Sequence, residues 1–190
     1  PDGFDDSVVR DVLGLVAKDK IAVIKSTILP GTTEDLQKSN ADTLILNSPE
    51  FLSEKTARAD IDHPDCNVIG LPIDNKIYRE KAELLKSILP EAPTIICSSR
   101  EAEFIKYTHN IHGFMEIIYT NILFDLSEKL KVEWSPVKEF MSYDKFMTDR
   151  YATPLHASGH ATKAGRGAGG HCFIKDFAAF REFYEKNVGQ

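Results

Sequence analysis

Short apolar runs alternate with amphipathic segments through the first half of the chain. The runs have the length and composition of buried strands and lie at 21–27, 43–46, 67–70 and 94–97. Helices are expected around them, one ending within 8–17, one beginning at 32–35 and one spanning 75–88. Strands that alternate with helices predict an α/β layer with a mainly parallel sheet.

The pattern changes after Ser99. From 100 to 131 there is no proline, and apolar residues recur on one broad face of a single long helix. Further helices are expected at 135–147 and 173–187. The long helix would measure on the order of 45 Å, more than a small domain needs, so a second subunit is expected to cover part of it. The fold class is therefore α/β followed by all-α, with a boundary near residue 98.

Composition is that of a globular protein, with 42% hydrophobic residues in a chain of 190. No apolar stretch is long enough for a membrane helix, and residues 1–10 lack the pattern of a signal peptide, so a cytoplasmic protein is expected. Three widely spaced cysteines indicate reduced thiols rather than a disulfide framework.

The charge pattern argues against nucleic acid as a partner. A net charge of −6 disfavours binding to a phosphate backbone, which needs a surplus of Lys and Arg. The segment 151–175 nevertheless contains no Asp or Glu, while Lys163, Arg166 and Lys175 occur in it. This window is either a place for a small anion or a flexible solvated loop.

The glycine-rich segment 165–176 (GRGAGGHCFIKD) carries the strongest chemical signal. Glycines let backbone N–H groups approach a ligand, and a helix that follows offers its positive end. A thiol at Cys172, with Arg166 and Lys175 nearby, would have a lowered pKa and would react as a thiolate. A small buried cysteine is the structural alternative.

Two further groups carry candidate chemistry. Lys106 and Asn110 lie four residues apart on the long helix, with Glu103 on the same face, where solvated side chains are the alternative. Glu50 and Glu54 follow a strand end, where open α/β sheets place their ligands, although acids at a helix start are also stabilising.

Four segments together resemble the nucleoside-diphosphate-sugar 6-dehydrogenases, the family of the UDP-glucose and GDP-mannose 6-dehydrogenases. They are VIKST with PGTT at 23–33, NSPEFLSE with HPD and VIG at 47–70, EFIKYTHN at 103–110, and GAGGHCFIKD at 167–176. They occur in the family's order and span nearly the whole chain. The resemblance implies that 1–97 is the latter part of a Rossmann-like NAD-binding domain and 98–190 a helical central domain that forms a homodimer through the 100–131 helix.

The resemblance also implies an activity, the NAD-dependent oxidation of the C6 alcohol of a nucleotide sugar to the acid. The catalytic residues would be Cys172, Lys106, Asp176, Glu50, Asn110 and Thr27. NAD would be contacted by Thr27, Glu54 and Lys175. The sugar nucleotide would be contacted by Glu50, Phe51, Leu52, Lys106, Asn110, Arg150, Gly167 and Gly169, with Arg150 reaching a neighbouring subunit's site.

Two alternatives stay open. No Gly-x-Gly-x-x-Gly occurs before Ile21, so the chain is expected to begin inside the nucleotide-binding domain and could be a non-catalytic dimerisation and sugar-nucleotide-binding module. A zinc hydrolase that uses His156, His160, His171 and Cys172 is the other; their spacing matches no tight zinc pattern, and no metal is expected.

Overall fold

A computed structural model describes residues 4–53, 56–156, 163–168 and 171–189. The side chains of His171 and Cys172 lie outside this description. The chain divides into two compact units, residues 1–108 with 179–190, and residues 109–178. The helices α5 (Ser99–Leu130) and α7 (His171–Asn187) contribute to both units.

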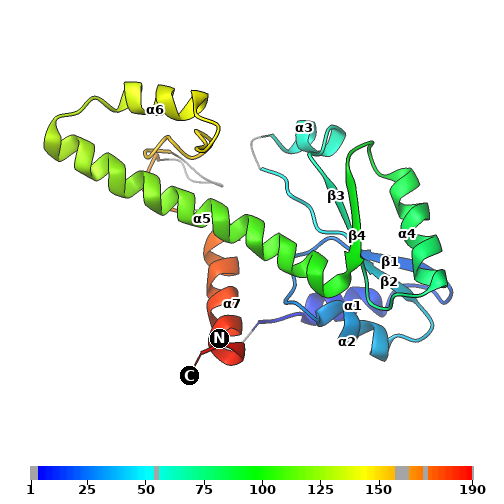
Figure 1. The fold of residues 1–190 in the computed structure, drawn as a ribbon. Coiled ribbons are helices and arrows are strands. Elements are labelled where there is room, and N and C mark those ends of the chain that lie inside the picture. Colours follow the sequence, from blue (N-terminus) through cyan, green and yellow to red (C-terminus); the bar gives the residue numbers. More distant parts are fainter. Residues whose placement is uncertain (1–3, 54–55, 157–162, 169–170, 190) are drawn as a thin grey trace. The chain divides into compact units, whose positions relative to one another are not determined.

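The first unit is built on a four-stranded sheet in the order β1-β2-β3-β4 (Figure 1). Its strands are β1 (Ile21–Ile24), β2 (Leu44–Asn47), β3 (Asn67–Leu71) and β4 (Thr94–Ser98). β1 pairs with β2 and β3 with β4 in parallel, whereas β2 and β3 are antiparallel. The carboxyl ends of β1 and β2 therefore share one edge of the sheet, and the expectation of a mainly parallel sheet is confirmed.

Helices cover both faces of this sheet. α4 (Lys76–Ile88) packs Tyr78, Ala82 and Leu85 against Leu46 and the β3 residues. α1 (Ser7–Leu13) and α2 (Thr32–Ser39) lie on the opposite face (Figure 1). There Leu13 and Leu36 cluster with Ile45. Neighbouring residues of a strand point to opposite faces, so Ile45 and Leu46 belong to different core clusters. The short α3 (Ala57–Asp62) has no buried residue, which explains why its periodicity gave no helix signal.

α5 begins at a hydrogen-bonded cap formed by Ser98 and Glu101. The backbone N–H of Glu101 donates to Ser98 Oγ at 3.2 Å, and the N–H of Ser98 donates to the Glu101 carboxylate at 2.8 Å. These two bonds satisfy donors that a helix start leaves free. The first turn then passes close to the sheet, because a Cβ built on Gly70 would lie 2.7 Å from Ala102 Cβ and from Ser99 Cα. The 32-residue helix agrees with the expected span.

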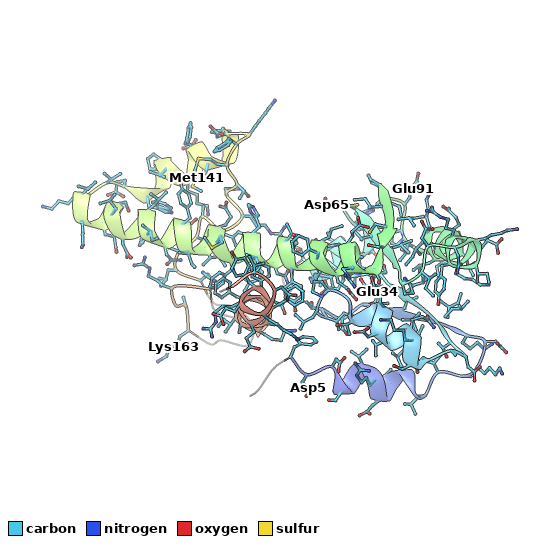
Figure 2. All side chains as sticks on the ribbon, turned by 60° about the horizontal axis from the view of Figure 1, so that its bottom comes forward. Asp5, Glu34, Asp65, Glu91, Met141 and Lys163 are labelled. Atoms are coloured by element: carbon cyan, nitrogen blue, oxygen red, sulfur yellow. The ribbon has the colours of Figure 1, made fainter. Side chains whose placement is uncertain are left out.

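The second unit packs α6 (Trp134–Tyr143) and the first turns of α7 against α5. Phe124 meets Trp134 edge to face, and Trp134 Nε1 donates to the carbonyl of Ala152 at 3.0 Å. Met141, which Figure 2 shows on α6, is buried. α6 ends before the expected residue 147, because the Asp144 carboxylate accepts the N–H of Phe146 at 2.7 Å and so competes with the helix.

Candidate active site

Lys106 is buried against the segment that follows β2. Its ammonium donates to the backbone carbonyl of Glu50 at 2.5 Å and lies 3.4 Å from the Glu50 carboxylate. The centroid of the Phe51 ring lies 5.4 Å from the same nitrogen. The Lys106 side chain is only 7% exposed, so the solvated alternative for this residue is wrong. The pair places an ammonium and a carboxylate together at the carboxyl edge of β1 and β2.

A second lysine lies at the same edge. Lys25, the first residue after β1, places Nζ 3.4 Å from the hydroxyl of Ser48, which is buried. Burial lowers the pKa of Lys25, and the nearby carboxylate of Glu50 acts in the opposite direction. Thr27 follows two residues later and is half-buried. Hydroxyl, ammonium and carboxylate groups from two strand ends thus meet at this edge, which is where open α/β sheets bind their ligands.

Glu103 holds α5 against the start of α2. Its carboxylate accepts the backbone N–H groups of Gly31 at 2.5 Å and of Thr33 at 2.8 Å. Gly31 is the residue before α2 and has φ of 100°, a conformation that glycine adopts readily. Burial raises the pKa of Glu103, whereas these hydrogen bonds act to lower it. Glu103 therefore caps another helix, a role that its spacing from Lys106 did not indicate.

In the second unit, Asn110 is paired with Asp176. Asn110 Nδ2 donates to the Asp176 carboxylate at 2.5 Å, and both side chains are buried. The ammonium of Lys175 lies 3.4 Å from the other oxygen of Asp176. Asn110 is a poor helix former in the middle of α5, and this bond accounts for its presence there.

The same unit brings α7 close to α5 at Gly113. A Cβ at Gly113 would lie 2.8 Å from the Phe173 ring and 2.9 Å from the Tyr151 hydroxyl. Burial raises the pKa of Tyr151, and Arg150 beside it acts in the opposite direction. Phe114, the next residue of α5, stacks on Phe177, one turn after Phe173 on α7, with ring centroids 4.4 Å apart. Gly113 was not singled out in the sequence, where a helical glycine gives no sign of what passes over it.

Two of the three basic side chains of this window, Arg166 and Lys175, form ion pairs within the second unit. Arg166 forms an ion pair with Asp125 and lies 3.8 Å from Glu128, and Lys175 is paired with Asp176. The contribution of Arg166 to an acidified thiol or to an anion site is therefore partly neutralised. The sequence could not indicate this, because the partners of Arg166 lie on the long helix.

The remaining predicted site residues are exposed, half-buried or outside the described residues. Leu52 is exposed, with its N–H donating to the Glu50 carboxylate at 2.7 Å, and Arg150 is exposed. Gly167 has φ of 92°, and Cβ atoms there would meet open space. Glu54, Gly169 and the Cys172 side chain lie outside the described residues, although the backbone of Cys172 is the second residue of α7.

The other two cysteines are free thiols. Burial, with a smaller effect of Glu101, raises the pKa of Cys97 to about 11. Within the described ranges, no group of three His, Cys, Asp or Glu side chains could hold a metal ion. His160 and the side chains of His171 and Cys172, named in the zinc alternative, fall outside those ranges. No helix among the described residues is long and apolar enough to cross a membrane.

Open α/β sheets, including those of the dinucleotide-binding enzymes, bind their ligands at the carboxyl ends of the strands, and this chain has its polar groups at that edge. Residues 4–89 match the NAD binding domain of the UDP-glucose/GDP-mannose dehydrogenase family, and residues 100–189 match its central domain. The chain belongs to this family, and its cofactor is NAD. The resemblance of the four motifs is thereby confirmed.

Individual relatives agree with the family match. The chain is 30% identical to the GDP-mannose 6-dehydrogenase of Pseudomonas savastanoi pv. phaseolicola, over 93% of this chain and 41% of that protein. It is 29% identical to the UDP-glucose 6-dehydrogenase of Rhizobium meliloti, over 91% of this chain and 39% of that protein. A UDP-glucose dehydrogenase structure from Pyrobaculum islandicum matches with a TM-score of 0.76 and 31% identity. The match covers 95% of this chain and 41% of that protein. The chain thus spans about two fifths of these relatives.

The carboxyl edge of β1 and β2 offers polar groups that fit a nucleotide cofactor. The side-chain oxygen of Asn47 is buried there and has no hydrogen-bond partner among the described residues. With the hydroxyls of Ser26 and Thr27 it offers the neutral donors and acceptors that a carboxamide and a ribose require. The diphosphate is usually bound by a glycine-rich turn, and that turn does not occur in the sequence before Ile21.

Proposed function

We propose that the chain carries the catalytic residues of a nucleotide-sugar 6-dehydrogenase, which oxidises the C6 alcohol of a UDP-glucose or GDP-mannose type substrate to the acid. One observation supports this most strongly. Lys106, Asn110 and Asp176, three of the polar residues of the family motifs on α5 and α7, are at most 5% exposed and each has a polar partner. Burying such groups costs free energy, so their retention favours a chemical role.

The proposed reaction proceeds in two oxidations and a hydrolysis. Bound NAD⁺ accepts one hydride in each oxidation and supplies no other chemistry. The alcohol first loses a hydride and a proton to give the aldehyde. The thiolate of Cys172 then adds to the aldehyde carbon, and the resulting thiohemiacetal loses the second hydride to become a thioester. Water cleaves the C–S bond and releases the carboxylate and the thiol, so that two NAD⁺ are reduced for each sugar.

The position of Cys172 in the chain suits a nucleophile. It is the second residue of α7, and the partial positive charge of a helix N-terminus stabilises a thiolate in the first turn. Because Arg166 is paired with Asp125, we expect the helix N-terminus to contribute more than Arg166 to stabilising this thiolate.

Lys106 and Asp176 would act on oxygen atoms. The Lys106 ammonium can stabilise the oxyanion that develops when the thiolate adds, because it is held in place by the Glu50 carbonyl before the reaction begins. Asp176, oriented by Asn110, can accept a proton from the hydrolytic water. By analogy with the family, Glu50 or Thr27, at the strand ends, would help to position the nucleophilic water through a further water molecule. Asn110 and the glycine-loop amides would bind the substrate.

The proposed homodimer would form through α5. Within the second unit, large apolar side chains form an exposed stripe with spacings of three and four residues: Met115, Ile118, Tyr119, Ile122, Leu126 and Leu130. A continuous apolar stripe of this length is typical of a subunit interface. We propose a second copy of the chain as its partner.

An activity assay tests the proposed function. The protein is incubated with NAD⁺ and a panel of nucleotide sugars, and NADH and the uronic acid are measured together. We expect two NADH per acid formed with one of the sugars. Lys106→Met should lower kcat by about 10²-fold or more, as removal of an oxyanion donor does, whereas Lys129→Met, an exposed lysine on the same helix, should leave it unchanged.

Binding of NADH separates this proposal from the non-catalytic module. Calorimetric titration should show NADH binding that weakens when Thr27 is replaced by Val, because the hydroxyl is lost while the shape is retained. Failure to bind NADH together with binding of the sugar nucleotide would favour the module.

A further inference from the structure

Arg166 is the most highly connected side chain of the glycine-rich loop in the described residues. Its Nε donates to the side-chain oxygen of Asn121 at 3.1 Å, and its Nη2 donates to the backbone carbonyl of Asn121 at 3.0 Å. Its Nη1 forms the ion pair with Asp125 and lies 3.8 Å from Glu128. The guanidinium carbon lies 5.1 Å from the centroid of the Phe124 ring. All three guanidinium nitrogens are therefore directed to α5.

The partners of Arg166 form one face of α5. Residues 121, 124, 125 and 128 follow the spacing of three and four that aligns side chains on a helix. They supply a carbonyl, an amide, a ring and two carboxylates to a single planar cation, which is the kind of recognition that arginine provides and lysine does not.

The loop is closed next to Arg166 by a backbone pair. The N–H of Gly165 donates to the carbonyl of His156 at 2.8 Å, and the N–H of His156 donates to the carbonyl of Gly165 at 3.0 Å. This antiparallel bridge joins the two ends of the segment 157–164. Arg166, one residue beyond the bridge, is the cation that connects this segment to α5.

We infer that Arg166 is a positioning residue, which fastens residues 165–168 to α5 and so restrains the described segment that comes shortly before the first turn of α7. The inference rests on the proposed function, because that turn contains Cys172. On this inference Arg166 binds groups of α5 and not a substrate phosphate, in contrast to the anion site that the basic window suggested.

Amide hydrogen exchange of the 190-residue chain tests the inference directly. The N–H groups of Gly165 and His156 exchange only when the bridge opens, so their rates report on the loop. Arg166→Met removes the charge and keeps the length, and it should raise both rates about tenfold, since hydrogen bonds to charged groups contribute that much or more. Lys163→Met is the matched control in the same loop and should leave both rates unchanged. The amides of β1 show whether each variant is folded.

A charge reversal separates the ion pair from general loss of side-chain packing. In Arg166→Glu a carboxylate faces Asp125 and Glu128, so the amides of His156 and Gly165 should exchange faster than in Arg166→Met. In the double variant Arg166→Glu with Asp125→Arg, their exchange rates should return toward the wild-type values. Wild-type rates in Arg166→Met, or a double variant no slower than Arg166→Glu, would overturn the inference.

The rate of Cys172 alkylation as a function of pH links the loop to the thiol. In the wild type a midpoint below that of a free cysteine supports the proposed function, and an ordinary midpoint contradicts it. In Arg166→Met the midpoint should move upward by a measurable step. Faster amide exchange with an unmoved midpoint would make Arg166 a structural residue only and would overturn its positioning role, whatever the wild-type midpoint is.

Discussion

Glu103, Lys106 and Asn110 are three of the polar side chains buried on α5, and each has a different partner. Glu103 meets backbone N–H groups of α2, Lys106 meets the carbonyl and carboxylate of Glu50, and Asn110 meets Asp176. Each arrangement offsets the cost of removing a polar group from water, since an unpaired buried group costs about 1–3 kcal/mol. Their spacing in the sequence shows that they share one side of a helix. It does not show that Glu103 caps another helix, whereas Lys106 and Asn110 pair with other residues of the candidate site.

Replacement of Glu103 tests the capping role. Glu103→Ala leaves the N–H groups of Gly31 and Thr33 without their acceptor, so the free energy of unfolding should fall by about 1–3 kcal/mol. Denaturation in urea measures the change. Glu182→Ala, an exposed glutamate on α7, should change it by less than about 0.5 kcal/mol. Equal effects of the two substitutions would contradict the role.

Cys97 should be unreactive near neutral pH. Its pKa of about 11 lies above the ordinary value of 9.0, so the thiolate is scarce at lower pH and increases as pH approaches 11. At about pH 8 its thiolate fraction is roughly one thousandth, some hundredfold below that of an ordinary thiol. Peptide mass spectrometry after brief treatment with iodoacetamide should therefore show little modification of Cys97. Rapid modification at that pH would show that its thiol is not protected.

At the scale of elements, periodicity predicted the strands and the long helices well. Four apolar runs became the four strands, and the helices expected at 75–88 and 100–131 occur as α4 and α5. The discrepancies have local causes. α6 stops at Asp144, whose side chain bonds the backbone, and α3 buries nothing and so carries no apolar signal. Hydrophobic patterning detects elements that bury one face. It does not detect the ends of helices or short helices on the surface.

The stripe on α5 leads to a prediction about assembly. Ile122→Glu with Leu126→Glu places two charges in the proposed interface, and the protein should become monomeric in sedimentation equilibrium. The matched control is Glu133→Lys, outside the stripe, which should leave the dimer intact. A wild-type monomer, or a dimer that persists in the double variant, would show that another surface or none is used.

Contacts between distant segments were the part of the site that the sequence could not indicate. Glycines and a cysteine before a helix predicted chemistry at 165–176, and the lysine and asparagine of α5 were found by their motif. The pairing of Arg166 with residues 121–128 depends on how the loop folds back on the helix. A basic residue in an acid-free window therefore suggested an anion site, whereas its acidic partners come from another element.

At the scale of the whole molecule, the candidate chemistry is distributed over both family matches. Glu50 and Thr27 come from the part that matches the NAD binding domain, whereas Lys106, Asn110, Cys172 and Asp176 come from the part that matches the central domain. The boundary near residue 98 stays a prediction of where these domains meet. The chain spans about two fifths of its relatives, so the activity of a complete enzyme is a proposal for this sequence.

Detection of a covalent sugar on Cys172 is the most direct test of the proposed chemistry. The protein is incubated with NAD⁺ and UDP-glucose or GDP-mannose, digested at low pH, and the peptide that contains Cys172 is weighed by mass spectrometry. Asp176→Asn, which should slow hydrolysis of the thioester, is expected to accumulate the adduct, and Cys172→Ser should show none while forming no uronic acid. Uronic acid formed by Cys172→Ser at the wild-type rate would contradict the account.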